Sequence, residues 1–146
     1  MKRIIYILLI SLMTMLISTS CNKRDINGDL DGMWQLTEWR DKDNNVKATK
    51  DDMIFYSFQL KMAKFLKQAE SENFSMMNSM LEFTSGQIRI YEPAVYGGEG
   101  HDDMKQMSEL AVFGVPEDGI FHVQLLTGSD MQLRTNSQDV LTFRKY

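Results

Sequence analysis

The sequence predicts an all-β domain of about eight strands closed into an up-and-down antiparallel β-barrel, with one short helix. Three observations favour this fold. From residue 32 onward short apolar segments alternate with turn signals, the chain's two prolines fall in loop-like contexts, and neighbouring segments align as hairpins with one shared apolar face. Closure into a barrel removes the exposed edges that an open sheet has to protect.

The first predicted strand spans residues 33–39 and contains both tryptophans of the chain. Trp34 and Leu36 share one face, because successive side chains of a strand point to opposite sides. Trp39 is separated from Trp34 by an odd number of positions. We therefore expect Trp39 on the opposite face or beyond the end of the strand.

The second predicted strand spans residues 53–62, where aromatic residues are dense and Phe58, Leu60 and Met62 alternate. Residues 60–73 fit a continuation of this strand, but the spacing of their apolar side chains also fits a helix. We expect the strand to continue past Met62.

A hairpin around a Ser85-Gly86 turn is the strongest local signal. A two-residue turn there places Phe83 opposite Ile88 and Leu81 opposite Ile90, so that four apolar side chains share one face.

The C-terminal third repeats this pattern with loops at residues 128–130 and 136–138. Loops of this length join the strands of a hairpin. They align Leu125 with Leu133, Leu133 with Leu141, and Met131 with Phe143, which continues the apolar face over three strands.

The one predicted helix falls within residues 100–114. Asp102 or Asp103 is its expected N-cap, and Gly114 follows its last residue. Its apolar residues at helical spacing are Met104, Met107, Leu110 and Ala111.

The first twenty residues predict a lipoprotein signal peptide. Basic residues precede an apolar run over residues 4–17, which is shorter than the ~20 residues that cross a bilayer. The small residues that follow, and then Cys21, resemble a bacterial lipobox. Ser18 replaces the usual leucine, as in the looser lipoboxes of Bacteroidetes.

This resemblance implies that Cys21 carries the lipid of an outer-membrane lipoprotein, which faces the periplasm or the cell surface. Residues 21–31 then form a tether, and residues 32–146 form the barrel. The alternative is an ordinary signal peptide followed by an exposed thiol, which is unusual in an oxidising compartment.

Composition excludes several classes of protein. Removing residues 1–20 takes away two of the 16 basic side chains and none of the 20 acidic ones, so the net charge falls from −4 to −6. An acidic chain is not expected to bind nucleic acid or an anionic lipid surface. Because Cys21 is the only cysteine, no disulfide can support the fold.

Two short motifs resemble a known family. Gly32-Met33-Trp34 is similar to the Gly-x-Trp at the start of the first strand in lipocalins and other calycins, and residues 141–146 resemble the ending of small lipocalin-like lipoproteins of Bacteroidetes. The resemblance implies that Trp34 plugs one end of the barrel and that Arg144 packs across it. Strict alternation turns Arg144 outward unless a bulge re-aims it.

The sequence offers little catalytic chemistry, so we expect no enzyme activity, metal or cofactor. It has two histidines and no nucleophile or phosphate-loop motif. His122 is predicted on the outer face of a strand, and residues 96–103 are predicted to be a solvated acidic loop rather than a metal site. Paired methionines such as Met77 and Met80 suggest core packing more than copper binding.

We expect an envelope-tethered barrel that binds a small apolar molecule in its interior. The candidate lining residues are Trp34, Leu36, Phe58, Leu81, Phe83, Ile88, Ile90, Leu125, Leu133, Leu141 and Phe143. The alternative is a solid barrel that contacts another envelope protein, with Trp39, Tyr56 and Tyr91 as its anchors.

Overall fold

The computed structural model describes residues 26–68, 74–84, 86–97 and 102–146, and ten antiparallel strands in these ranges form one sheet. The predicted signal peptide, Cys21 and His101 lie outside the described residues. The strands are β1 (Gly32–Arg40), β2 (Val46–Thr49), β3 (Ile54–Gln59), β4 (Met62–Gln68), β5 (Phe74–Thr84), β6 (Gln87–Tyr96), β7 (Asp102–Met104), β8 (Ile120–Leu126), β9 (Asp130–Thr135) and β10 (Val140–Lys145).

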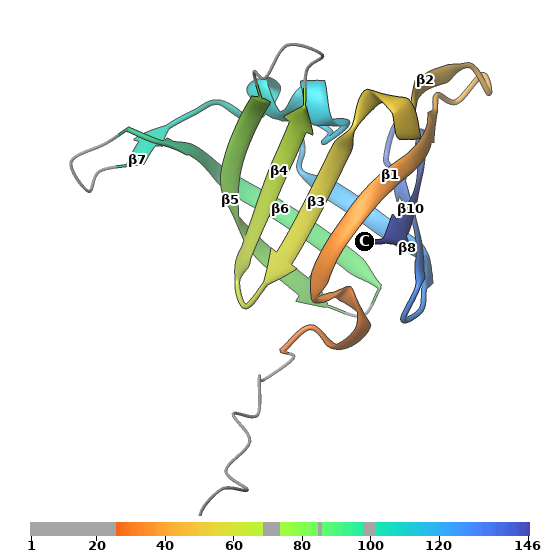
Figure 1. Ribbon diagram of the computed structural model, residues 1–146, viewed down its shortest axis with the longest axis horizontal. Helices are drawn as coiled ribbons and strands as arrows, with labels where there is room; N and C mark the ends of the chain where they lie inside the picture. The colour runs from red at the N-terminus through yellow and green to blue at the C-terminus, as the bar shows by residue number, and fades with distance from the viewer. Residues whose placement is uncertain (1–25, 69–73, 85, 98–101) are drawn as a thin grey trace, which may run out of the picture.

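Eight of these strands close into a barrel, which confirms the predicted fold (Figure 1). Each of β1, β3, β4, β5, β6, β8, β9 and β10 pairs with the next, and β10 pairs back with β1. The other two strands are short additions. β2 pairs with the end of β1, and β7 pairs with the end of β6 as an arm that extends beyond the barrel (Figure 1).

The described residues contain three short 3₁₀ helices: η2 (Gly28–Leu30) precedes β1, η3 (Lys50–Asp52) joins β2 to β3, and η4 (Met107–Phe113) lies between β7 and β8. The predicted N-cap at Asp102 or Asp103 is wrong, because these residues pair with β6. Gln106 is the actual N-cap, and its backbone N–H donates to the Glu109 carboxylate at 3.1 Å. Within the described residues, no helix has the length and apolar character needed to span a membrane.

The region after Met53 forms two strands instead of one. Leu60 and Lys61 make a tight turn between β3 and β4, and Leu60 adopts a left-handed backbone with φ 57°. The prediction that Leu60 and Met62 continue the apolar face of Phe58 is therefore wrong, and both side chains are about half exposed. The strand that we expected past Met62 is confirmed through Gln68, and residues 69–73 lie outside the described residues.

The two hairpins with the clearest alternation have the predicted register. Leu81 pairs with Ile90 and Phe83 with Ile88 across β5 and β6. Between β9 and β10, the pairs are Leu133 with Leu141 and Met131 with Phe143.

The predicted pairing of Leu125 with Leu133 is wrong. Val123 pairs with Leu133 instead, and Leu125 pairs with Gln132, because β8 contains a bulge between these two positions. The extra residue of a bulge moves the following side chain to the other face. Leu125 consequently points outward and is 48% exposed.

A second bulge changes the orientation of Trp39. Leu36 pairs with Phe143, whereas Glu38, two positions further along β1, pairs with Thr142, only one position away on β10. β1 therefore has one extra residue here, and Trp39 pairs with Leu141. The bulge returns Trp39 to the inner face, where it packs against the buried core. The prediction that the two tryptophans lie on opposite faces is wrong for this reason.

Candidate functional site

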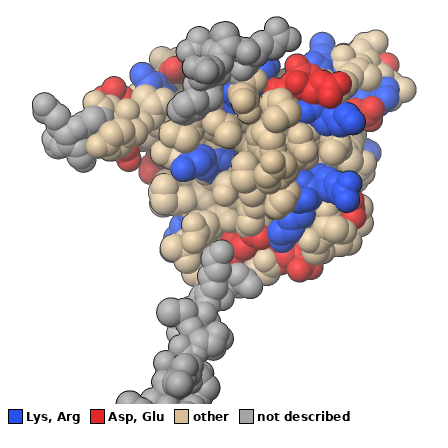
Figure 2. All heavy atoms as spheres, viewed as in Figure 1, with Lys and Arg blue, Asp and Glu red and all other residues tan. Residues whose placement is uncertain are grey.

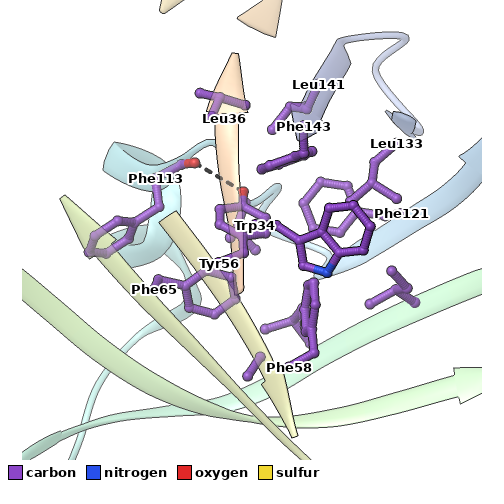
Figure 3. Close-up of a cluster of buried hydrophobic side chains, with 14 of the residues drawn as sticks. Trp34, Leu36, Tyr56, Phe58, Phe65, Phe113, Phe121, Leu133, Leu141 and Phe143 are labelled. Carbon is purple, nitrogen blue, oxygen red and sulfur yellow. Dashed lines mark hydrogen bonds between the residues drawn. The ribbon is translucent and has the colours of Figure 1, made fainter. Parts of the chain in front are cut away.

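The barrel interior was the predicted ligand site, and Tyr56 on β3 occupies its centre. The Tyr56 ring lies 4.7 Å from Phe65 on β4 and 4.7 Å from Phe143 on β10, measured between ring centroids. It also lies 6.4 Å from Phe121 on β8 (Figure 3). Side chains from different walls of the barrel therefore meet at one ring, and this level of the interior is filled.

The Tyr56 hydroxyl joins the barrel wall to η4. It donates a hydrogen bond to the Phe113 backbone carbonyl at 3.0 Å, within the buried core (Figure 3). Burial raises the pKa of the Tyr56 phenol far above its ordinary value, because the anion would lose its hydration. Tyr56 is thus a neutral hydrogen-bond donor that holds η4 over one end of the barrel.

The predicted lining residues mostly fill the interior. Nine of the eleven have at most 2% of their surface accessible, and a side chain that faces a water-sized void would have more. They are Trp34, Leu36, Phe58, Leu81, Ile88, Ile90, Leu133, Leu141 and Phe143. The other two are Phe83, which packs against the core and is partly buried, and Leu125, which faces solvent.

Ser79 differs from Thr135, the other buried polar side chain of the described residues, whose hydroxyl accepts a hydrogen bond from Asp139. The Ser79 side chain is 3% exposed, and its hydroxyl has no hydrogen-bond partner among the described residues. Ser79 pairs with Ala63 across β4 and β5, so two small side chains stand together in the wall. An unpaired buried hydroxyl is costly, and nothing in the pattern of residues indicates it in advance.

Trp34 closes the end of the barrel at which β1 begins. Its indole Nε1–H donates to the Leu30 backbone carbonyl at 2.8 Å, and both side chains are fully buried. Leu30 lies within the residues predicted to be the tether, so the packed core begins before Gly32.

The basic residue over Trp34 is Lys145, and the predicted pairing with Arg144 is wrong. The Lys145 Nζ lies 4.9 Å from the centroid of the Trp34 ring. Trp34 pairs directly with Lys145 in the register of β1 and β10, so alternation turns Arg144 to the outer face.

The backbone at Gly32 favours glycine, because its φ of 127° is one that other residues rarely adopt. A Cβ at this position would also lie 2.8 Å from Cε of Lys145, so the flexible lysine chain would have to shift. The glycine of the Gly-x-Trp motif therefore serves the turn of the backbone first and the seat of Lys145 second.

Trp39 closes the opposite end, near η4. Its Nε1–H donates to Asp139 Oδ2 at 3.0 Å. Gly114, which ends η4, packs so closely that a Cβ there would lie 3.3 Å from the Trp39 ring. The sequence did not predict this contact, because the bulge that turns Trp39 inward leaves no signal in the alternation of residues.

A polar groove on the outer face carries charged side chains of both signs. It has a volume of about 380 Å³ and lies over β1, β9 and β10, with Arg134 and Gln132 on one side. Arg40 donates to both carboxylate oxygens of Glu38 at 2.7 Å, and this hydrogen bonding lowers the pKa of Glu38. The charged side chains that line the groove are Arg40, Lys42 and Arg134 on the basic side and Glu38 and Asp41 on the acidic side, so a small positive excess remains.

The described residues contain no cluster of three histidine, cysteine or acidic side chains that could hold a metal ion. His122 is partly exposed and contacts the Asn136 side-chain oxygen at 2.8 Å. Met77 belongs to the buried core, and Met80 stands at an outward position of β5. The spacing of Met77 and Met80 therefore does not bring their sulfur atoms together.

The predicted surface anchors are only partly available. Tyr56 is fully buried, so its assignment as an anchor is wrong. Tyr91 is partly buried, with the Arg89 guanidinium 5.3 Å from its ring centroid. Two more exposed side chains are Tyr96, at 67%, and Met104, at 63%, on the arm formed by β6 and β7; Tyr146, near the seam of β1 and β10, is 76% exposed.

Comparison with known proteins agrees with this architecture. A family model described as a lipocalin-like domain matches residues 14–146. A lipocalin-like protein from Bacteroides uniformis ATCC 8492 is 25% identical with a TM-score of 0.61, over 82% of this chain and 100% of that one. An uncharacterized protein from Bacteroides eggerthii DSM 20697 is 26% identical with a TM-score of 0.60, over 80% and 99%.

A third structure, of a protein from Burkholderia xenovorans, shares the fold at 16% identity and a TM-score of 0.51, over 88% of this chain and 93% of that one. A search of curated proteins found no match. The resemblance noted at Gly32 and Trp34 is thus confirmed by the family model and by the two Bacteroides structures. The chain belongs to the lipocalin-like family.

Proposed function

We propose that this protein is a non-catalytic, solid-core barrel that is tethered to the bacterial envelope by lipid on Cys21 and binds another envelope protein. The filled interior is the observation that supports an interaction module over a ligand carrier. Rings from β3, β4, β8 and β10 meet at Tyr56, and surrounding side chains have almost no accessible surface. A barrel of this size either is filled by side chains or holds one small ligand.

The arm formed by β6 and β7 is the surface that we assign to the partner. Tyr96 and Met104 are both more than 60% exposed, and Ala94 pairs with Met104 where the arm leaves the barrel. Tyrosine and methionine are enriched in the cores of protein interfaces. An arm of this kind adds little to the barrel core, so its apolar side chains are available to another protein.

The absence of catalysis is supported by the state of the ionisable groups. The shifted carboxylates, Glu38 and Asp41, lie on the surface and are held by Arg40 and Asn45. Tyr56 is buried and stays neutral. General acid–base catalysis works best with a pKa near the operating pH. The lowered pKa values of Glu38 and Asp41 lie further from neutral pH, and the buried Tyr56 hydroxyl is out of reach of a substrate.

Site-specific photo-crosslinking in the native envelope tests the partner site. Benzoylphenylalanine replaces Tyr96 in the full-length protein, and Val46, 49% exposed on β2, is the matched control position. We expect one light-dependent adduct at position 96 that is absent at position 46 and is lost with Met104→Ser. Identical adducts at both positions, or none at position 96, would contradict the proposal.

A small apolar ligand is the second candidate, and Ser79 is the observation that favours it. The unpaired Ser79 hydroxyl stands beside the small side chain of Ala63 in the barrel wall, where a ligand's polar group could pair with it if the core opened. Native mass spectrometry of the protein purified from its own envelope is the test. A retained mass of a few hundred daltons that is lost in Ser79→Ala supports this candidate, and a bare polypeptide mass rejects it.

A further inference from the structure

Exposed apolar side chains gather at the end of the barrel where the chain enters. Ile26 is 57% exposed, and Leu60 and Met62 are each 51% exposed. The Asn27 side chain donates to the Leu60 backbone carbonyl at 2.8 Å. The entering chain is thereby fastened to the turn between β3 and β4. We call Ile26, Leu60 and Met62 the tether-end patch.

The fold does not explain why a leucine occupies position 60. Its φ of 57° is a left-handed conformation that asparagine and glycine adopt more easily than leucine. The side chain stands between two shallow hollows of about 390 and 340 Å³ and lines both. Ile26, Phe83 and Tyr91 also line the first hollow, and Met62 lines the second. Polar and charged side chains, among them Lys61 and Lys64, complete the two hollows, so the patch is a set of exposed apolar side chains with a polar surround.

The length of chain before Ile26 determines what can cover this patch. Five positions separate Cys21 from Ile26. At ~3.3–3.6 Å per residue, that segment reaches at most about 18 Å. A lipid on Cys21 therefore holds Ile26, the first residue of the tether-end patch, within about 18 Å of the membrane surface. By contrast, η4 lies at the other end of the barrel (Figure 1).

We propose that the tether-end patch faces the bilayer and that Leu60 and Ile26 insert into the boundary between lipid headgroups and acyl chains. This orientation rests on the lipid anchor of the proposed function. Apolar insertion rather than charge drives it, because the first hollow beside the patch is lined by both Lys61 and Glu82. Acidic and basic side chains are likewise mixed on the side of the barrel that Figure 2 shows. The arm of β6 and β7 leaves the barrel near its opposite end and stays accessible to a partner (Figure 1).

A nitroxide label at position 60 tests this orientation. Cys21 is the only cysteine, so Leu60→Cys supplies the one free thiol once Cys21 is lipidated. The lipidated full-length protein is placed in vesicles of phosphatidylethanolamine and phosphatidylcholine. Val112→Cys on η4 is the control, because Val112 is 53% exposed at the other end.

We expect the ratio of collisions with oxygen to collisions with a water-soluble nickel reagent to rise several-fold at position 60 and to stay at its aqueous value at position 112. Equal, aqueous ratios at both positions, with acyl groups on Cys21 shown by mass spectrometry, would overturn the orientation alone. An unmodified Cys21 would overturn the anchor and the orientation together.

Leu60→Asn separates membrane contact from folding. Asparagine suits the left-handed turn, so we expect an unfolding temperature equal to or above that of the unchanged protein. The oxygen-to-nickel ratio of a label at Met62→Cys should fall at least twofold in the same variant. An unchanged ratio would count against Leu60 as an inserted residue.

Discussion

The two ends of the barrel are each closed by a tryptophan of β1, but the closures differ in kind. Trp34 is fully buried, donates to the Leu30 backbone carbonyl and is covered by Lys145. Trp39 is partly buried, and it donates to the side chain of Asp139. The Trp34 closure is therefore part of the core, whereas Trp39 forms a lid that covers the edge of the core. Burial decides how much each indole stabilises the fold, because the stabilisation grows with the apolar surface that is removed from water.

The largest expected effect is that of Trp34→Ala. Removing a fully buried indole leaves a cavity and an unpaired Leu30 carbonyl, so we expect a loss of about 3–5 kcal/mol in the free energy of unfolding. Urea denaturation followed by circular dichroism measures it. A loss below about 1 kcal/mol would mean that the end of the barrel is not closed by this residue.

Trp39→Ala should cost less, about 1–3 kcal/mol, because part of the ring already faces solvent. The same urea titration gives the comparison with Trp34→Ala directly. Trp39→Phe is the control that keeps a six-membered aromatic ring and removes the pyrrole part of the indole together with the donor to Asp139. Equal losses for the two alanine variants would remove the distinction between core and lid.

Tyr56→Phe tests the attachment of η4 at the Trp39 end. The variant leaves the buried Phe113 carbonyl without its donor, for which we expect a loss of about 1–2 kcal/mol. Hydrogen exchange should also show faster opening of residues 107–113 while the exchange of β3 changes little. Unchanged exchange of η4 would show that its position does not depend on this hydrogen bond.

The same residue predicts a dependence on alkaline pH. Burial raises the pKa of Tyr56 in the folded state, so its contribution to stability is complete below the unfolded pKa of about 10. Above that pH the folded state should lose about 1.4 kcal/mol per pH unit from this group. Urea titrations between about pH 9 and 11 should show a shallower loss in Tyr56→Phe, and equal slopes would contradict the assignment.

Lys145→Met should have the smallest effect. It removes the cation over Trp34 and the hydrogen bond from Nζ to the Asp29 carbonyl, but keeps an apolar chain over the ring. We expect a loss of at most about 1 kcal/mol. Arg144→Met is the matched control, since Arg144 is exposed, and it should change stability by less. A larger loss of stability for Arg144→Met than for Lys145→Met would favour the pairing of Arg144 with Trp34 that the family resemblance implies.

The features that the sequence predicted correctly are those that alternation and turn residues encode locally. The β5–β6 hairpin has Gly86 in its turn, and the register of Leu81 with Ile90 follows from counting. Trp39 and Leu125 were misplaced because each follows a bulge, which changes the face without changing composition. The Leu60-Lys61 turn contains none of the usual turn residues, so its sequence is typical of a strand.

The nature of the interior could not be predicted at all. Large apolar residues at inward positions fill a barrel or line a cavity equally well, and the difference depends on which rings meet across it. Around Tyr56 the interior is filled, because its hydroxyl donates to the Phe113 carbonyl and its ring contacts side chains from three other strands. These contacts join residues up to about ninety positions apart, beyond what local patterns report.

The seam between β1 and β10 has a consequence for how the chain folds. It joins the first and last strands of the barrel, with Trp34 opposite Lys145. Such distant pairing is slow, because the loop entropy must be lost before the contact forms. Until residues 140–145 arrive, β1 and β9 are both open edges that can pair with other chains. A chain truncated before Val140 should therefore aggregate rather than form a smaller barrel.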